Sequence, residues 1–403
     1  MRHKLLALIL PIAAIVGCAK TGDSTDYTRF VNTKIGSGGH GHVFVGANVP
    51  FGLVQLGPTS IPQTWDWCSG YHDSDTTVIG FSHTHLEGTG IGDLFDVTVM
   101  PVIGSVTYAR GEAPAQDATP EEIEAAVKTG LWSYADRTKE ITKPGYYSVP
   151  LTRFGIKAEM TATSRVGLHR YTFPASDSSA IVFDLENGGC WDKATQTLTE
   201  AVDSVTIRGY RYSTGWAKNQ KAFFYAQFSK PFDKFENMGA YSRIDFHTTE
   251  GEQIMVKVAL SPVSMDGAEA NMKAEMPEWD FEGTVKAAEK AWNEELSKIK
   301  IDTDDAEART VFYTAMYHSM IQPSVFNDVN RDYRGANDQI YRNGNFVNYT
   351  TFSLWDTYRA AMPLMTIIHP EKVNDIANTM INIYEQQGKL PVWHLWGNET
   401  DCM

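Results

Sequence analysis

The feature that most constrains the fold of this chain is a change in its hydrophobic pattern near residue 265. Before this point, short runs of β-branched and aromatic residues are separated by Gly, Asn, Asp and Pro, as at 146–151, 166–173 and 253–260. Many short strands without helices between them are typical of an antiparallel β-sandwich, which we predict for residues 28–265. The exception is 119–129, where Thr-Pro-Glu-Glu is typical of a helix start.

Beyond residue 265 the apolar residues recur at helical spacing, in segments 281–300, 304–321 and 371–387. We therefore predict a multidomain chain that is β and then α, with a helix-containing linker at 266–300 and an α-helical domain at 301–403. Three or four helices make only part of a helical barrel. We accordingly expect the sequence to be the front part of a longer protein.

The N-terminus has the pattern of an export signal. Arg2, His3 and Lys4 precede an apolar stretch that is too short to span a bilayer as a mature helix. This stretch ends in Ile-Val-Gly-Cys18, which resembles a bacterial lipobox. We predict a signal peptide at 1–17, lipidation of Cys18 and a polar tether at 18–27. An ordinary signal peptide cut nearby is the alternative.

These signals predict an exported bacterial lipoprotein, in the periplasm or on the outer-membrane surface, whose only membrane contact is its lipid anchor. The formal net charge is −14, which argues against nucleic acid and against anionic membrane surfaces as partners. The 42% hydrophobic content is typical of a globular protein. The sequence does not define the oligomeric state.

Two His-x-His pairs, His40/His42 and His83/His85, are one alternative source of chemistry. On a strand this spacing places both imidazoles on one face, so that four histidines converging on a transition metal would make a zinc site. The rival interpretation is that these histidines form hydrogen bonds in a polar domain interface. No helical His-x-x-x-His spacing accompanies the pairs.

Two aromatic segments have the composition of a saccharide site. The first is Trp65-Asp-Trp67-Cys-Ser-Gly-Tyr-His, where an indole would stack on a sugar while Asp accepts hydrogen bonds from the sugar hydroxyls. One of the two tryptophans is expected to pack in the interior instead. In Phe-Ser-Leu-Trp355-Asp356-Thr-Tyr-Arg359, a platform, an acceptor and a donor share one helix end. The alternative there is a buried structural Asp–Arg pair.

The third aromatic segment is Trp-His394-Leu-Trp-Gly-Asn398-Glu399-Thr. Here we expect an apolar, aromatic pocket around the Glu399 carboxyl. Such a pocket disfavours the anion and keeps a proton available for a leaving oxygen near neutral pH. Glu399 is therefore the candidate general acid, and His394 and Asn398 are candidate substrate-binding residues.

Across nearly the whole mature chain, ordered motifs resemble the glycoside hydrolases of family 92, the calcium-dependent exo-α-mannosidases. The matching segments are 31–36, 40–42, 50–52, 65–72, 80–85, 88–90, 144–148, 165–169, 352–359 and 393–403. The resemblance implies an N-terminal β-sandwich, a linker with helices and a C-terminal (α/α)6 barrel, with the active site between the domains.

By the same resemblance, the parent protein removes terminal α-mannose from glycans with inversion, assisted by calcium. Glu399 looks like the general acid, Trp355 and Asp356 like the residues that hold the terminal mannose, and Trp65 or Trp67 like a wall of the pocket. The family's catalytic base, several calcium ligands and the residues that select the linkage are expected downstream of residue 403. The chain alone is therefore expected to be incomplete and inactive. A non-catalytic surface glycan-binding protein is the alternative.

Overall fold

The computed structural model describes residues 25–60, 65–109, 119, 130–189 and 191–402. The predicted signal peptide, the lipidated Cys18 and the predicted helix after residue 119 lie outside these residues. None of the helices in the described ranges is long and apolar enough to cross a membrane.

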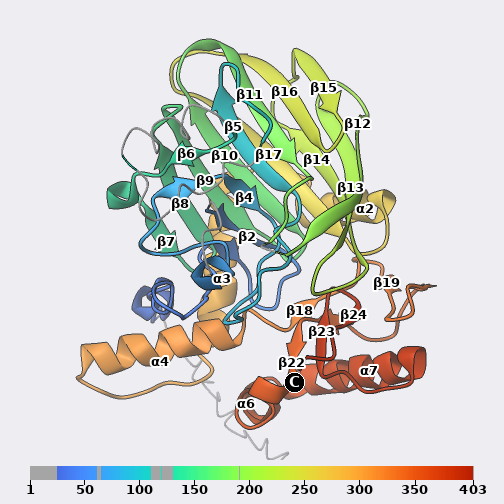
Figure 1. Ribbon diagram of the computed structural model, residues 1–403. Coiled ribbons are helices and arrows are strands. Elements are labelled where there is room, and N and C mark those ends of the chain that lie inside the picture. The colour runs from blue at the N-terminus through green and yellow to red at the C-terminus, as the bar shows by residue number, and fades with distance from the viewer. Residues whose placement is uncertain (1–24, 61–64, 110–118, 120–129, 190, 403) are drawn as a thin grey trace, which may run out of the picture.

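Two antiparallel sheets form the N-terminal half, in the upper part of Figure 1. The seven-stranded sheet has the order β1 (Ala47–Asn48), β2 (Gln55–Thr59), β4 (Gly80–Ser82), β5 (Thr98–Ile103), β11 (Ser176–Asp184), β16 (Tyr241–Thr248) and β15 (Lys234–Met238). The eight-stranded sheet has the order β12 (Lys193–Ala201), β13 (Thr206–Thr214), β14 (Gln220–Phe228), β17 (Glu252–Ser261), β10 (Val166–Phe173), β9 (Ile156–Ala162), β8 (Tyr146–Leu151) and β7 (Ile141–Lys143).

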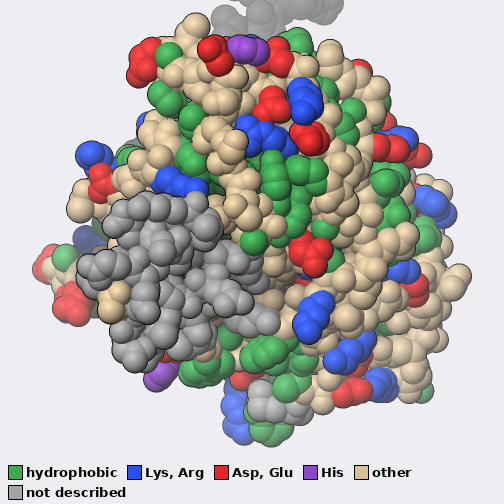
Figure 2. All heavy atoms as spheres, turned by 45° about the horizontal axis from the view of Figure 1, so that its top comes forward, with side chains coloured by type: hydrophobic (Ala, Val, Ile, Leu, Met, Phe, Trp, Pro, Cys, Tyr) green, Lys and Arg blue, Asp and Glu red, His purple; other side chains and the backbone are tan. Residues whose placement is uncertain are grey.

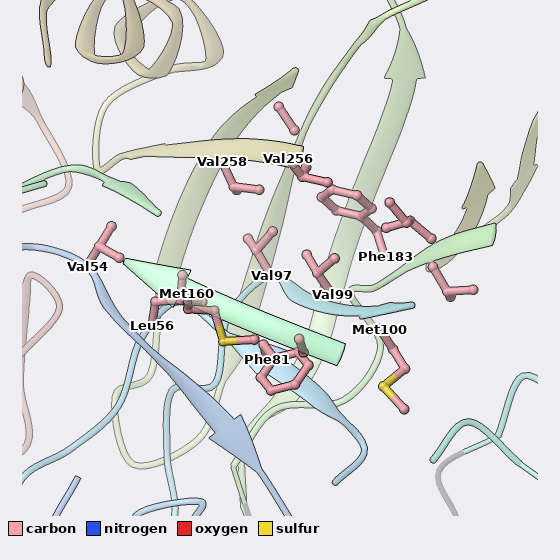
Figure 3. Close-up of a cluster of buried hydrophobic side chains, with 14 of the residues drawn as sticks. Val54, Leu56, Phe81, Val97, Val99, Met100, Met160, Phe183, Val256 and Val258 are labelled. Atoms are coloured by element: carbon pink, nitrogen blue, oxygen red, sulfur yellow. The ribbon is translucent and has the colours of Figure 1, made fainter. Parts of the chain in front are cut away.

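The main core lies between these sheets (Figure 3). Phe81, Val99 and Phe183 come from the seven-stranded sheet, and Met160 and Val256 come from the eight-stranded sheet. Period-two alternation explains the arrangement, because successive side chains of a strand point to opposite faces. The prediction of an antiparallel β-sandwich is confirmed.

Helices follow the last strand of the large sheet. They are α2 (Met265–Glu275), α3 (Phe281–Leu296), α4 (Ala306–Ser319), α5 (Leu354–Thr357), α6 (Ala361–Ile368) and α7 (Pro370–Gln387). The helices α4, α6 and α7 gather at one end of the sandwich, at the bottom of Figure 1. The predicted order of β and then α is confirmed. Helix α3 ends at Leu296, before the predicted end at residue 300.

The helix ends follow from local chemistry. Side chains of Ser264, Asp280 and Asp305 accept hydrogen bonds from the first-turn amides of α2, α3 and α4. Helix α7 begins with Pro370 and ends before Gly388, whose φ of 81° suits glycine.

The linker helices attach the helical part to the sandwich. Helix α2 packs on β14 and β17. In α3 the indole Nε1 of Trp292 donates to the carbonyl of Asn48 at 2.8 Å, and its ring contacts Tyr317 of α4, with 4.4 Å between the ring centroids. A second core cluster therefore joins the sandwich, α3 and α4.

Short strands and single turns complete the described structure. The paired strands are β3 (Thr77–Val78) with β6 (Ser133–Tyr134), β18 (Ser324–Val325) with β21 (Tyr349–Thr350), and β19 (Tyr333–Arg334) with β20 (Ile340–Tyr341). A three-stranded sheet joins β22 (Phe352–Ser353), β23 (Trp393–Leu395) and β24 (Asn398–Glu399). The 3-10 turns are η1 (Thr28–Phe30), η2 (Trp65–Trp67) and η3 (Arg137–Lys139).

Charged side chains of both signs are interspersed on the face of the sandwich shown in Figure 2. Lys and Arg side chains there lie close to Asp and Glu side chains. They do not gather in one basic area.

Candidate active site

A cavity of about 170 Å³ lies where the sandwich meets the helical part. Glu87, Gly88 and Thr89 line it from the β side, and His318, Ser353 and Asp356 are among the residues that line it from the helical side. The cavity thus combines carboxylates and hydroxyls with an apolar wall of Met362 and Met365. Convergent polar groups in an apolar setting are typical of ligand sites.

The pair Glu87 and His318 crosses the domain junction inside this cavity. Glu87 Oε1 lies 2.7 Å from His318 Nδ1, and Glu87 Oε2 accepts a hydrogen bond from the Phe44 amide at 2.6 Å. Burial opposes a charge on His318, but the neighbouring Glu87 carboxylate raises the pKa of His318 above its usual value. The result is a charge-assisted contact between a loop of the sandwich and α4.

Asp356 lies on α5, at the edge of the cavity, and accepts a hydrogen bond from the Ser353 hydroxyl. Trp355 is next to it and is 61% exposed. The Arg359 guanidinium lies over the ring of Tyr358, 5.0 Å from its centroid. Asp356 and Arg359 are both exposed, which excludes the buried structural pair considered from the sequence.

The two tryptophans of η2 have different surroundings. The Trp65 indole is 50% exposed and donates from Nε1 to the carbonyl of Gly90 at 2.7 Å. Trp67 stacks on His72, with 4.2 Å between the ring centroids, and donates to Asp75. Trp65 is therefore the tryptophan available to a ligand, and Trp67 has the packing role expected for one of the pair.

The hairpin β23–β24 carries Glu399. Its carboxylate accepts hydrogen bonds from the backbone amides of Val392, Trp393 and Asp401, at 2.9, 2.9 and 3.0 Å. The hydrogen-bond partners of the Glu399 carboxylate are thus amides, and the aromatic pocket expected around it is replaced by a polar hairpin. Because β23 pairs with β22, the hairpin is fixed beside Ser353, which binds Asp356.

The aromatic rings next to Glu399 in the sequence belong to the core. Trp393 contacts Trp216 with 4.4 Å between centroids, and Trp396 donates from Nε1 to the carbonyl of Lys221. The Asn398 side chain both donates to and accepts from the backbone of Asn219, so it ties the hairpin to the sandwich.

His394 lies opposite Glu399 in the register of β23 and β24. Its side chain is buried, and neither ring nitrogen has a hydrogen-bond partner among the described residues. Burial, with a contribution from the Arg334 charge, lowers the pKa of His394 to about 3. His394 is therefore a neutral imidazole on the buried side of the hairpin to which it belongs.

The four histidines of the His-x-His pairs do not form a metal site. His83 Nε2 contacts His169 Nε2 at 3.0 Å, and His85 Nδ1 lies 2.8 Å from the carbonyl of Gln55. His40 Nδ1 lies 2.5 Å from Asp66. The described ranges contain no group of three or more His, Cys, Asp or Glu side chains that would hold a metal ion. The convergence required by the zinc alternative is thus not found among the described residues. Hydrogen bonds account for His40, His83 and His85, whereas His42 packs edge-on against Trp65, with 4.2 Å between the ring centroids.

Sequence analysis did not find Glu87, His318 or Thr89 as cavity residues. Glu87 and His318 are 231 positions apart, and neither belongs to an aromatic motif of the kind that drew attention to Trp65 and Trp355. The resemblance included Gly88-Thr-Gly90, which was the only signal close to this wall.

Comparison with known proteins gives two family matches that together span most of the chain. Residues 30–261 match the glycosyl hydrolase family 92 N-terminal domain, and residues 267–403 match the glycosyl hydrolase family 92 catalytic domain. A similar curated protein is an uncharacterized secreted glycosidase of Arthroderma benhamiae. It is 25% identical over an alignment of 391 positions, which covers 87% of this chain and 48% of that protein.

Two solved structures have similar folds. A family 92 α-mannosidase of Bacteroides thetaiotaomicron in complex with mannoimidazole is 35% identical, with a TM-score of 0.87, over 94% of this chain and 51% of its own. An inverting family 92 mannosidase of the same organism is 21% identical, with a TM-score of 0.78, over 94% of this chain and 51% of its own. The chain thus spans about half the length of these relatives.

Proposed function

The chain belongs to glycosyl hydrolase family 92, and on that premise we propose that the protein hydrolyses terminal α-linked mannose of glycans. The observation that carries this proposal is the cavity at the domain junction. Asp356 and Thr89 line this cavity. Two exposed indoles adjoin these residues, because Trp355 precedes Asp356 in the chain and Trp65 donates to the carbonyl of Gly90, which follows Thr89. Ser353, which also lines the cavity, lies on the strand that pairs with the hairpin carrying Glu399. The mannosidase that is 35% identical was solved with mannoimidazole, which supports a mannose-type ligand. Because the relatives are about twice as long, the activity is proposed for the whole protein.

The chemistry follows from the side chains. Asp356 accepts hydrogen bonds from sugar hydroxyls, while Trp65 and Trp355 present apolar faces to the ring. Glu399 is proposed as the general acid that protonates the departing glycosidic oxygen on the ground of the family resemblance, because a polar hairpin replaces the aromatic pocket expected around its carboxyl. Inversion then needs a second carboxylate that activates water from the opposite face of the ring, and we propose this inverting course for the protein. No described residue is assigned as that base.

Calcium stays a prediction of the resemblance. The described residues contain no group of three or more His, Cys, Asp or Glu side chains that would hold the ion, and several of its ligands are expected downstream of residue 403. Export likewise stays a proposal. It is supported by the N-terminal pattern and by the curated relative described as a secreted glycosidase.

The test of the catalytic assignment compares Glu399→Gln with a matched control, Glu385→Gln, which changes an exposed glutamate of α7. The protein is assayed on an unactivated α-mannobiose, whose leaving group needs a proton. We expect Glu399→Gln to lower kcat by about 10²- to 10⁴-fold, and Glu385→Gln to leave it unchanged. Unaltered turnover by Glu399→Gln would exclude Glu399 as the acid.

A second candidate function is glycan binding without hydrolysis. It is favoured by one observation: the Asp356 carboxylate lines the cavity and the exposed indole of Trp355 is next to it, which is the composition of a saccharide-binding site. Methyl α-mannoside binding without α-mannobiose cleavage would support this function. Cleavage that depends on Glu399 would rule it out.

A further inference from the structure

Three tryptophans are exposed among the described residues: Trp65 at 50%, Trp191 at 52% and Trp355 at 61%. The proposed function uses Trp65 and Trp355. Trp191 belongs to none of the motifs of the sequence and does not line the cavity. An indole is costly to leave in water, and a fixed exposed indole is often a ligand platform.

Trp191 is attached to the same loop that forms the β wall of the cavity. In this loop Thr89 lines the cavity and Gly90 accepts the hydrogen bond of Trp65. The Trp191 amide donates to the carbonyl of Gly92 at 3.1 Å. Gly92 lies three positions after Thr89, so the backbone of Trp191 lies within about 14 Å of the cavity wall. This distance is short enough for one ligand longer than a monosaccharide to reach both places.

A buried ionic network holds the backbone next to Trp191. Asp192 bonds to the Arg211 guanidinium and accepts a hydrogen bond from Ser213 at 2.7 Å. Arg211 also bonds to Asp96 at 2.8 Å, and its side chain and those of both aspartates are fully buried. Buried ion pairs contribute little net stability, because desolvation offsets their attraction. A role in fixing geometry explains such a network better than a role in stability.

The backbone on the other side of the network is strained. Leu94, Phe95 and Val97 have φ values of 66°, 63° and 53°, in the left-handed region that is unfavourable for such residues. Gly189 lies so close that a Cβ atom there would be 2.5 Å from the Asp93 amide nitrogen. Strained segments cluster at functional sites, so this loop has the properties of a site that positions Trp191.

We propose that Trp191 forms an outer subsite, where its indole stacks on a sugar unit beyond the terminal mannose that occupies the cavity. The proposal rests on the proposed function and specifies its substrate class: an oligosaccharide of at least two or three units rather than a single mannose. The apolar face of a pyranose ring fits an indole, and the gain from such stacking is comparable to that of other ring contacts, about three- to tenfold in affinity.

The experiment is a calorimetric titration of the whole protein with methyl α-mannoside and with an α-linked mannotriose. The parent protein and every variant carry Glu399→Gln, so that the mannotriose is not hydrolysed during the titration. Trp191→Ala is compared with Val202→Ala, which removes a side chain that is 50% exposed in the turn after β12. Nine residues of strand separate that turn from Asp192, so it lies about 30 Å away. Trp191→Phe is a second variant that keeps a ring. Thermal unfolding followed by circular dichroism verifies that all variants are folded.

We expect Trp191→Ala to weaken mannotriose binding three- to tenfold and to change methyl α-mannoside binding less than twofold. Trp191→Phe should retain most of the mannotriose affinity, and Val202→Ala should retain all of it. Equal mannotriose affinity of the Trp191→Ala protein and its parent overturns the outer subsite and leaves the proposed function standing. Failure of the parent protein to bind either ligand overturns the proposed function and the subsite with it.

Discussion

Asp328 is a buried carboxyl group at the junction between the sandwich and the helical part, and its ionisation makes the stability of the chain depend on pH. It accepts hydrogen bonds from Ser261, the last residue of β17, at 2.9 Å and from Asn271 of α2 at 2.8 Å. Burial raises the pKa of Asp328 to about 6, against an ordinary value of 3.8. The junction therefore contains a carboxyl group that is more easily ionised in the unfolded chain than in the native one.

The sign of the effect follows from the numbers of bound protons. Between about pH 4 and pH 6 the native state keeps a proton that the unfolded state has lost, so stability falls as the pH rises through this window. A difference of about two pKa units corresponds to about 3 kcal/mol. Asp328→Asn cannot ionise and has nearly the same shape. We therefore expect the native chain to lose about 3 kcal/mol relative to this variant between pH 4 and pH 7.

Urea unfolding of both proteins at pH 4, 5, 6 and 7 measures this difference. Other titrating groups are common to both proteins and cancel in the comparison. Asp302→Asn, at an exposed aspartate, is the control and should give a difference that does not change with pH. If the difference for Asp328→Asn is also constant with pH, the carboxyl group is solvated in the native state and the reasoning is wrong.

Two further outcomes are expected from the buried polar groups. Arg211→Met leaves Asp96 and Asp192 buried without their cation. We expect this variant to lose about 3–5 kcal/mol in the free energy of unfolding measured with urea. A loss below about 1 kcal/mol would show that the two ion pairs are not buried as described. Burial lowers the pKa of His83 to about 4, so stability should fall as the pH drops from about 6.5 to 4, because only the unfolded state takes up the proton. At pH 5.5, NMR should find His83 neutral and His247, whose pKa is raised by Asp233, protonated. Titration of His83 near 6.5 would refute its burial.

The sheets were predictable because their pattern is local. The segments 146–151 and 166–173 coincide with β8 and β10, since alternation and turn residues define both ends. Helix α2 was not predicted. Its buried residues are Ala268, Asn271 and Met272, a weak apolar stripe whose stability comes from packing on β14 and β17.

The candidate site was predictable only in part. Aromatic composition identified Trp65, Trp355 and Asp356, and these lie at or near the cavity. It did not distinguish rings that face solvent from rings that belong to the core, such as Trp393 and Trp396. Whether a ring faces solvent or the core is decided by the alternation along the three-residue strand β23 and by contacts with Trp216 and Lys221. These contacts exist only in the folded chain.

Several contacts at and beside the cavity are long-range, which explains why no single motif revealed it. Glu87 meets His318, Asn219 meets Asn398, and β22 meets β23, so each wall is positioned by a part of the chain far from it in sequence. A site of this kind depends on the angle between the domains. Loss of the Glu87–His318 contact should therefore affect ligand binding, while the hairpin stays attached to the sandwich, because Trp393, Leu395 and Trp396 belong to the main core cluster. The cavity is best regarded as a property of the domain junction, with Trp191 fixed on the sandwich side of it.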